Sequence, residues 1–156
     1  MREIKFRLIL DNKIVGYEKW YAGKRNPQTG LWEAEDRWLY SKDGKYWNPQ
    51  YIYHHKKDMY TGLKIRDKEV YEGDIIQLKW ESGIDDNDNP KYETENILVY
   101  WDEDACNFLV QWSGFEYEKM AVGYAPDWWD NDENRIEFEV IGNIYENPEL
   151  LKERKP

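Results

Sequence analysis

The chain has 156 residues and a formal net charge of −10, and it contains nine Trp, thirteen Tyr and a single Cys. One cysteine cannot form an internal disulfide, and no apolar run approaches the roughly 18 residues of a membrane-spanning helix. With no positively charged leader at its start, the sequence predicts a cytoplasmic protein that does not insert into a membrane.

Charge is divided unevenly along the chain. Residues 1–60 hold twelve Lys or Arg against eight Asp or Glu, a balance of +4, whereas residues 61–156 hold ten against twenty-four, a balance of −14. An acidic second half repels phosphate backbones and makes nucleic-acid binding there unfavourable. The many Trp and Tyr residues favour β structure, in which aromatic side chains pack well.

The first half is predicted to consist of hairpins. Residues 4–8 alternate apolar and polar side chains, as a half-buried strand does, and a turn at residues 11–12 leads to a second strand over residues 13–21. A second hairpin and a short strand are predicted to follow: residues 37–41, a turn at residues 42–45, residues 46–47, and then residues 51–53.

The second half begins with a turn signal at residues 71–74. Gly73 tolerates a positive φ, and Asp74 can bond its side chain to nearby backbone. Residues 75–80 begin with two β-branched residues and alternate apolar and polar side chains from Ile76 on, which predicts a strand. Residues 81–95 are acidic and rich in Asn, and they are predicted to be an exposed hairpin loop.

Three further strands are predicted at residues 96–101, 108–112 and 135–145. A long segment over residues 113–134, predicted to include a short helix, lies between the last two. Gly142 is predicted to mark a bend, and residues 147–151 a helical turn. The predicted core of this half consists of inward-facing positions of the strands: Ile75, Leu78 or Trp80, Val99, Trp101, Leu109, Trp112, Phe138 and Val140.

Two acidic stretches imitate calcium-binding loops without completing them. Residues 85–89 carry acidic and amide side chains at alternate positions, but Pro90 stands where the loop needs glycine, and a similar run near residue 130 fails likewise. His54 and His55 are adjacent, so on a strand they point to opposite faces and cannot chelate one ion. The sequence predicts no metal site and no cofactor.

Groups for catalysis are few. Ser41, Ser82 and Ser113 lie beside turn or loop residues, and none occurs in a nucleophile elbow. Cys106 follows Asp-Glu-Asp-Ala, and neighbouring carboxylates disfavour its thiolate. No glycine-rich phosphate loop occurs. The sequence predicts no catalytic residues, and an enzyme is not expected.

Aromatic residues are the best candidates for binding. Residues 17–60 hold four Trp and seven Tyr among basic side chains, a combination that can stack single-stranded bases or sugars. However, β hairpins also pack aromatic side chains across strands, and oligomer interfaces are rich in Tyr and Trp, so we favour packing and protein interfaces. The candidate partner-binding residues are Trp32, Trp38, Trp47, Trp128 and Trp129.

Three blocks of the chain occur in a recognisable order: MREIKFR at the start, YTGLKIRDKEVYEGDII at residues 60–76, and EVIGNIYENPELL at residues 139–151. These blocks resemble the YopX-like family of phage and prophage proteins, and they cover both ends of the chain. The resemblance implies a phage setting and an SH3-type barrel in the C-terminal half. It implies no particular activity, because the family has no established biochemical role.

These patterns predict a mainly β fold with an N-terminal hairpin-rich subdomain over residues 1–60 and a C-terminal SH3-like small barrel over residues 61–156. The predicted function is that of a phage-encoded, non-enzymatic accessory protein that forms a homo-oligomer and binds an unknown host or phage protein. Halves of opposite charge favour head-to-tail contacts between copies, so assembly is expected to weaken as salt rises. The alternative is a nucleic-acid-associated protein or an acidic mimic of DNA.

Overall fold

The computed structural model describes residues 3–111, 119–121 and 136–151. The chain divides into two compact units, Met1–Gly62 and Leu63–Pro156. Strands make up most of the described residues, their sheets are antiparallel, and the helical element among them is one 3₁₀ turn. The predicted mainly β class is therefore confirmed.

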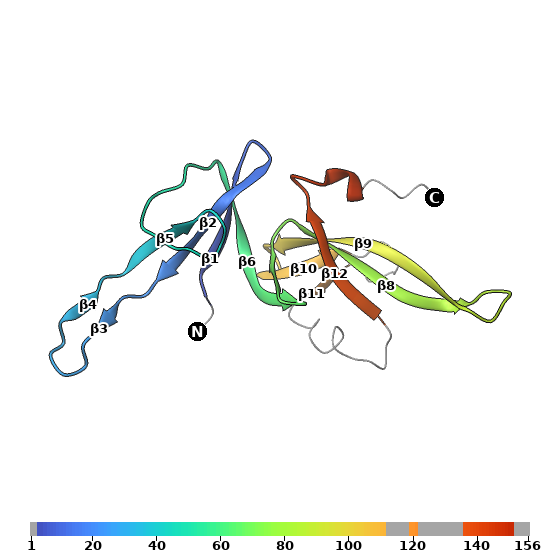
Figure 1. Ribbon diagram of the computed structural model, residues 1–156, viewed down its shortest axis with the longest axis horizontal. Coiled ribbons are helices and arrows are strands. Elements are labelled where there is room, and N and C mark those ends of the chain that lie inside the picture. Colours follow the sequence, from blue (N-terminus) through green and yellow to red (C-terminus); the bar gives the residue numbers. More distant parts are fainter. Residues whose placement is uncertain (1–2, 112–118, 122–135, 152–156) are drawn as a thin grey trace. The chain divides into compact units, whose positions relative to one another are not determined.

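An antiparallel sheet forms the first unit (Figure 1). Its strands in chain order are β1 (Lys5–Leu10), β2 (Lys13–Tyr21), β5 (Arg37–Ser41) and β6 (Lys56–Ile65). They are arranged β5-β2-β1-β6, and β6 continues past Gly62, where β7 (Lys68–Tyr71) is its neighbour. Two short strands, β3 (Lys24–Arg25) and β4 (Trp32–Ala34), form a ribbon in the connection between β2 and β5 (Figure 1).

The first predicted hairpin is confirmed. Asp11 and Asn12 have φ values of 51° and 58°, the left-handed conformation that a two-residue loop between antiparallel strands requires. Asn and Asp tolerate this conformation better than other non-glycine residues. The turn sets the register of β1 against β2, in which Leu10 pairs with Lys13.

The second predicted hairpin is wrong beyond its first strand. The chain that follows β5 pairs with it only through an isolated bridge between Asn48 and Tyr40, and residues 51–53 form no strand. Gln50 N–H donates a hydrogen bond of 2.9 Å to Asn48 Oδ1. Such a local side-chain bond bends the chain away from the neighbouring strand and ends the ladder.

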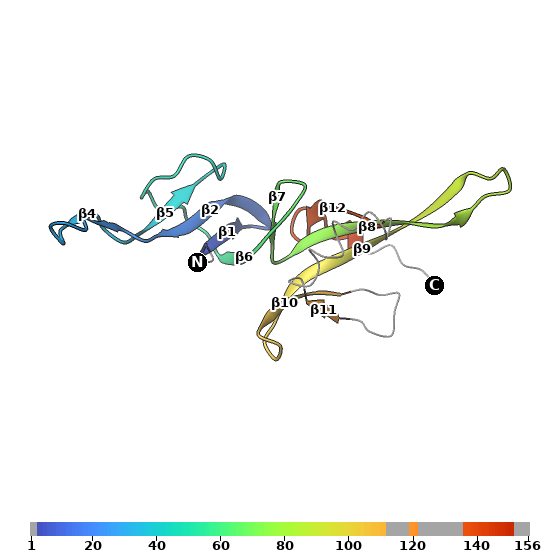
Figure 2. The same cartoon turned by 90° about the horizontal axis from the view of Figure 1, so that it is seen from below.

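A five-stranded antiparallel sheet forms the second unit, in the order β11-β10-β9-β8-β12 (Figures 1 and 2). The strands are β8 (Asp74–Ile84), β9 (Pro90–Asp102), β10 (Asn107–Gln111), β11 (Lys119–Ala121) and β12 (Ile136–Asn143), followed by the 3₁₀ turn η2 (Pro148–Leu151). The helical turn predicted at residues 147–151 is thus present. Among the described residues the outer strands β11 and β12 do not pair, so the sheet is open and the predicted closed barrel is not confirmed.

The predicted turn between β7 and β8 is confirmed. Gly73 has a φ of 81°, and the buried carboxylate of Asp74 accepts a hydrogen bond of 2.8 Å from Tyr71 N–H. Gly73 N–H donates to Val99 O at 2.8 Å, and Ile144 N–H donates to Gly73 O at 2.9 Å. Because both backbone groups of Gly73 are used, this turn joins β9 to the chain that follows β12.

A long hairpin of β8 and β9 replaces most of the loop predicted at residues 81–95. Pairing continues to Ile84 and Pro90, so the connecting loop is only residues 85–89 (Figure 1). The polar composition of this segment disfavours strands by intrinsic preference, but pairing with a neighbouring strand decides the conformation. The predicted loop was therefore too long at both ends.

Asp85 organises the short loop. Its Oδ1 accepts hydrogen bonds from the backbone N–H groups of Asn89 at 2.9 Å and Asn87 at 2.8 Å. These two bonds lower the pKa of the Asp85 carboxyl below its ordinary value.

We expect residues 84–90 to be the least protected part of the chain in amide hydrogen exchange, because every one of them is exposed. Asp85→Ala should accelerate exchange further at Asn87 and Asn89, since it removes their shared acceptor. Exchange mass spectrometry without added calcium measures both effects. Slow exchange across this loop in the unmodified chain would contradict the prediction.

The core of the second unit contains residues from β6 to β12: Ile65, Val70, Ile76, Leu78, Ile97, Val99, Phe108, Val110 and Phe138. Of the predicted core positions, five are buried, namely Ile75, Leu78, Val99, Leu109 and Phe138, and two are partly buried, Trp80 and Val140. Trp101 is 37% exposed, contrary to prediction. It lies near the end of β9, where its ring packs at 5.0 Å on Phe108. Trp112 lies outside the described residues.

Strand β12 carries an irregularity where a bend was predicted. Its register against β8 shifts between Val140 and Gly142, which is a β-bulge. A bulge increases the local twist of a strand and bends it. The bend predicted at Gly142 is confirmed.

Candidate binding surfaces of the first unit

Three of the predicted partner-binding tryptophans lie in the first unit, and the structure does not bring them together. Trp38 is on β5, Trp32 is on β4 of the ribbon, and Trp47 is in the loop between β5 and β6. Trp128 and Trp129 lie outside the described residues. The sheet register shows which side chains share a face, because paired residues of antiparallel strands point the same way.

One face of the sheet, which we call the tryptophan face, carries Ile4, Phe6, Trp20, Trp38 and Met59. Phe6 pairs with Met59, Trp20 pairs with Trp38, and Trp20 N–H donates to Ile4 O. Ring centroids lie 5.3 Å apart for Trp20 and Trp38 and 6.0 Å apart for Phe6 and Trp38. Trp20 and Trp38 are each 36% exposed, Met59 39% and Ile4 52%. Large apolar side chains are therefore open to solvent side by side.

A buried carboxylate lies in the middle of this face. Glu18 is 1% exposed and pairs in register with Phe6 and Tyr40. Its carboxylate accepts a hydrogen bond from Lys57 Nζ, which lies 5.4 Å and 5.5 Å from the ring centroids of Phe6 and Trp38. Burial, and then the charge of Glu18, raise the pKa of Tyr40 above its ordinary value. The positive charge of Lys57 is thus balanced by the negative charge of Glu18 within the tryptophan face.

The opposite face of the sheet holds cations against aromatic rings. Lys5 is 6% exposed, and its Nζ lies 5.3 Å from the ring centroid of Trp47 and 5.9 Å from those of Tyr17 and Tyr60. Lys19 Nζ lies 4.4 Å from the same Trp47 ring. Trp47 is therefore occupied by two lysines of its own chain, in contacts that contribute about 0.5–2 kcal/mol each.

The ribbon of β3 and β4 presents Trp32 at its tip. The Arg25 guanidinium lies 4.3 Å from the Trp32 ring centroid, Trp32 is 47% exposed and Leu31 is 70% exposed. Asn26 Oδ1 accepts hydrogen bonds from the backbone N–H groups of Gln28 and Thr29 at 2.9 and 3.1 Å. An ordered turn thus displays two apolar side chains to solvent.

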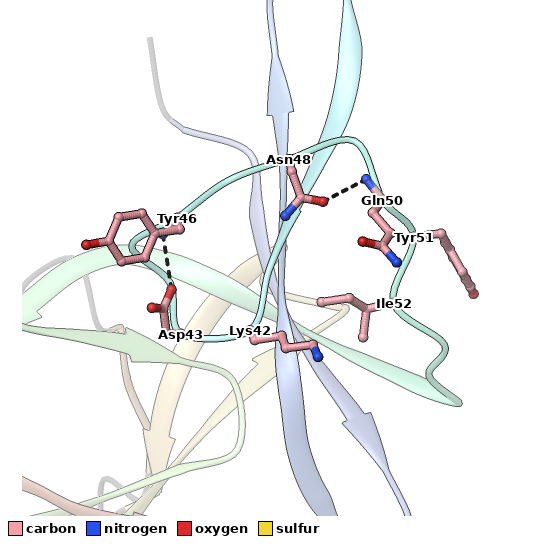
Figure 3. A pocket seen from close by; sticks show the side chains of 7 residues that line it. All are labelled: Lys42, Asp43, Tyr46, Asn48, Gln50, Tyr51 and Ile52. Carbon is pink, nitrogen blue, oxygen red and sulfur yellow. Dashed lines mark hydrogen bonds between the residues drawn. The ribbon is translucent and has the colours of Figure 1, made fainter.

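A pocket that no sequence pattern indicated lies in the loop between β5 and β6 (Figure 3). Its volume is about 240 Å³. The lining residues all come from one stretch of chain: Lys42, Asp43, Tyr46, Asn48, Gln50, Tyr51 and Ile52. Asp43-Gly44 and Asn48-Pro49 are turn signals in the sequence, but they do not reveal that the two turns enclose a space.

Local hydrogen bonds hold the start of the pocket loop. Ser41 Oγ accepts from Gly44 N–H at 2.9 Å, and Asp43 Oδ1 accepts from the backbone N–H groups of Lys45 at 2.8 Å and Tyr46 at 3.1 Å. The bonds from Lys45 and Tyr46 lower the pKa of Asp43. This carboxylate is therefore ionised at neutral pH.

The far end of the pocket loop is held against the sheet. Asn48 and Tyr40 exchange backbone hydrogen bonds of 2.7 and 2.9 Å, and the Tyr51 ring packs at 5.4 Å on Tyr40. Ile52 Cδ1 lies 2.8 Å from the point where a Cβ on Gly16 would stand. The same Cβ would lie 2.6 Å from Ser41 O on the backbone of β5, so the close packing at this place requires glycine.

No cluster of three or more His, Cys, Asp or Glu side chains is placed to hold a metal ion in the described part of the chain. His54 Nδ1 lies 2.9 Å from Ile52 O, and His55 Nε2 lies 3.1 Å from the Tyr53 hydroxyl. Cys106 is exposed, and its thiol donates to a backbone carbonyl. Across the described ranges, none of the helical structure is long and apolar enough to span a membrane.

A family model described as YopX protein matches residues 18–152, which include strands of both units. No curated protein matches the chain, and no solved structure does.

Proposed function

Because the chain belongs to the YopX protein family, we propose that it is a phage- or prophage-type accessory protein that works by binding proteins, including copies of itself, and not by catalysis. The tryptophan face is the proposed interface. Partners other than its own copies are proteins of the phage or of the host.

The observation that carries this proposal is the exposure of the tryptophan face. Trp20, Trp38, Met59 and Ile4 expose between 36% and 52% of their surface on one side of one sheet. Single exposed apolar residues are common on protein surfaces, but contiguous ones mark interaction sites. Trp is also enriched among the few residues that contribute most of the binding energy at interfaces.

The charges around the rings favour a protein partner over a nucleic acid. On the tryptophan face Lys57 is bonded to the buried Glu18, and on the opposite face Lys19 Nζ lies 3.8 Å from a Glu3 carboxylate oxygen. Affinity for nucleic acid depends on cations that neutralise phosphates, and these cations already face carboxylates. The proposal accordingly predicts little salt-dependent binding to single-stranded DNA, and a steep salt dependence would favour the alternative.

Self-association has a second source of support in the division of charge. The balance of +4 over residues 1–60 against −14 over residues 61–156 attracts unlike halves of neighbouring copies. Charge guides such an encounter but contributes little affinity, because exposed ion pairs are worth about 0–1 kcal/mol each. The apolar side chains of the tryptophan face supply the remainder.

For the second unit we propose that the open sheet is part of an SH3-like small barrel. The support is that Ile65 and Val70, from β6 and β7, pack in the same core cluster as Phe138 of β12. The hairpin of β6 and β7 and the sheet that follows it thus pack on one core. A sheet must curve around its core to do this, as the strands of a small barrel do. The bulge at Gly142 adds to the curvature.

Trp38→Ala tests the interface, with Trp101→Ala as the matched control. The two tryptophans are 36% and 37% exposed, and each packs against a neighbouring ring, but only Trp38 belongs to the tryptophan face. We expect Trp38→Ala to weaken self-association at least roughly 30-fold, since a central aromatic contact contributes about 2 kcal/mol or more. Light scattering over a concentration and salt series measures it.

The control variant should associate as the unmodified chain does. Circular dichroism establishes that both variants are folded. Equal losses for the two variants would remove the tryptophan face from the proposal, and a monomeric mass at low salt and high concentration would remove self-association. Binding to a phage or host protein is then tested with the same pair of variants.

A further inference from the structure

The lining of the pocket of residues 42–52 includes one amine, on Lys42, and two side-chain amides, on Asn48 and Gln50, that can donate hydrogen bonds. Asn48 Oδ1 accepts a hydrogen bond from Gln50 N–H, while no hydrogen bond from the Asn48 NH₂ group is seen among the described residues. Within the described part of the chain, no hydrogen bond or ion pair engages Lys42 Nζ or the side-chain amide of Gln50. Figure 3 shows Asn48, Gln50 and Lys42 around the loop, with Ile52 between the last two.

The acidic lining residue, Asp43, is engaged within its own turn. Asp43 Oδ1 accepts hydrogen bonds from the Ser41 hydroxyl and from the backbone N–H groups of Lys45 and Tyr46. These donors are neutral, so Asp43 keeps its negative charge, but its Oδ1 atom is engaged within the turn. Figure 3 shows the carboxylate on the side of Tyr46, away from the amine of Lys42.

The size and the apolar wall restrict the ligand further. A volume of about 240 Å³ lies below the range of about 300–1,000 Å³ that is usual for sites of drug-sized molecules. The pocket therefore suits a ligand of few atoms or the end of a chain. The aliphatic side chain of Ile52 lines one side, and its Cδ1 occupies the space beside Gly16 where a Cβ would stand.

We infer that this pocket binds a carboxylate that carries a short aliphatic group, either a small carboxylic acid or the C-terminus of a peptide. Lys42 supplies the charge, and the amide groups of Asn48 and Gln50 donate hydrogen bonds. A carboxylate accepts hydrogen bonds at both oxygens and donates none, which matches the donors on these walls. The loop is held by its own turns before a ligand arrives, which lowers the cost of ordering it. This site is separate from the tryptophan face and goes beyond the proposed function.

N-acetylalanine and its amide, N-acetylalaninamide, test the inference because they differ in the carboxylate alone. Each is titrated into the ¹⁵N-labelled full chain while the side-chain NH₂ signals of Asn48 and Gln50 are followed by NMR. We expect saturable shifts with the acid. The amide should bind at least about tenfold more weakly, since charge-assisted hydrogen bonds are stronger than neutral ones. Lys42→Gln should reduce the acid to the level of the amide.

Lys45→Gln is the matched control, because it removes one charge from the same loop outside the pocket lining. It should leave the affinity for the acid unchanged. Propionate, which lacks the peptide group, distinguishes a small carboxylic acid from a peptide C-terminus as the ligand. Affinity equal to that of N-acetylalanine indicates a free small acid, and tighter binding of N-acetylalanine indicates a peptide C-terminus. Equal responses to acid and amide, equal losses in both lysine variants, or no saturable shift with any of the three compounds would overturn the inference.

Discussion

Phe138→Ala is expected to lower the free energy of unfolding of the second unit by about 3–5 kcal/mol. Phe138 is 4% exposed and stands on β12 opposite Leu78 of β8. It belongs to the same core cluster as Val99 and Phe108. The truncation removes apolar burial and also leaves a cavity, which a close-packed sheet core fills only in part.

Native-state hydrogen exchange of the amides of Ile76 and Leu78 on β8 measures this loss within the second unit. Glu137→Ala is the control, because Glu137 is exposed on the same strand and lies 3.7 and 3.9 Å from Arg66 and Lys79. Surface ion pairs of this kind are worth about 0–1 kcal/mol. A loss below about 1 kcal/mol for Phe138→Ala would mean that β12 does not cover the core.

The burial of Phe138 could be predicted from the sequence because alternation along a strand is a local property. Ile136, Phe138 and Val140 recur at every second position, and the structure buries Phe138 fully and the other two partly. Turn chemistry is equally local, which is why the turns at Asp11-Asn12 and at Gly73 were predicted correctly.

Errors arose where a neighbouring strand or a side-chain bond decides the conformation. Residues 81–84 and 90–95 are strand because β8 and β9 pair there, although their composition is that of a loop. Residues 51–53 have strand composition but follow the bend at Asn48. Trp101 alternates correctly with Val99 yet lies near the end of its strand, and alternation gives no information about where a core ends.

The tryptophan face likewise could not be predicted from local sequence patterns. Trp38 was among the predicted partner-binding residues, but Trp20, Phe6, Met59 and Ile4 were not. They come together only through the strand order β5-β2-β1-β6, which joins residues more than fifty positions apart, as Phe6 and Met59 are. Strand order depends on long-range pairing, and composition within 17–60 indicated aromatic richness without a face.

Asp58→Ala is expected to destabilise the first unit by about 3–5 kcal/mol, as removal of one partner from a buried ion pair does. Asp58 is 0% exposed and stands on β6 directly opposite Arg7 of β1, which is 4% exposed. Arg7 Nη2 lies 3.1 Å from Asp58 Oδ2. The variant leaves the guanidinium charge buried without this carboxylate, and burial of a charge is costly unless it is compensated.

Hydrogen exchange of the amide of Leu8 on β1 measures the loss within the first unit. Glu33→Ala is the control, since it removes a pair in which Lys24 Nζ lies 3.2 Å from Glu33 Oε2 and the side chains are 71% and 41% exposed. That variant should lose less than about 1 kcal/mol. Similar losses from the two variants would show that burial does not set the cost.

The double variant Arg7→Met/Asp58→Leu separates the cost of removing Asp58 alone from the worth of the pair. Met is close to Arg in volume and Leu has the branched shape of Asp, and the two charges are removed together. We expect stability within about 1 kcal/mol of the unmodified chain or above it, because hydrophobic replacement of a buried pair is often neutral or stabilising. If the double variant is as unstable as Asp58→Ala, the loss arises from the bonds of Asp58 themselves and not from the buried guanidinium charge that Asp58→Ala leaves on β1.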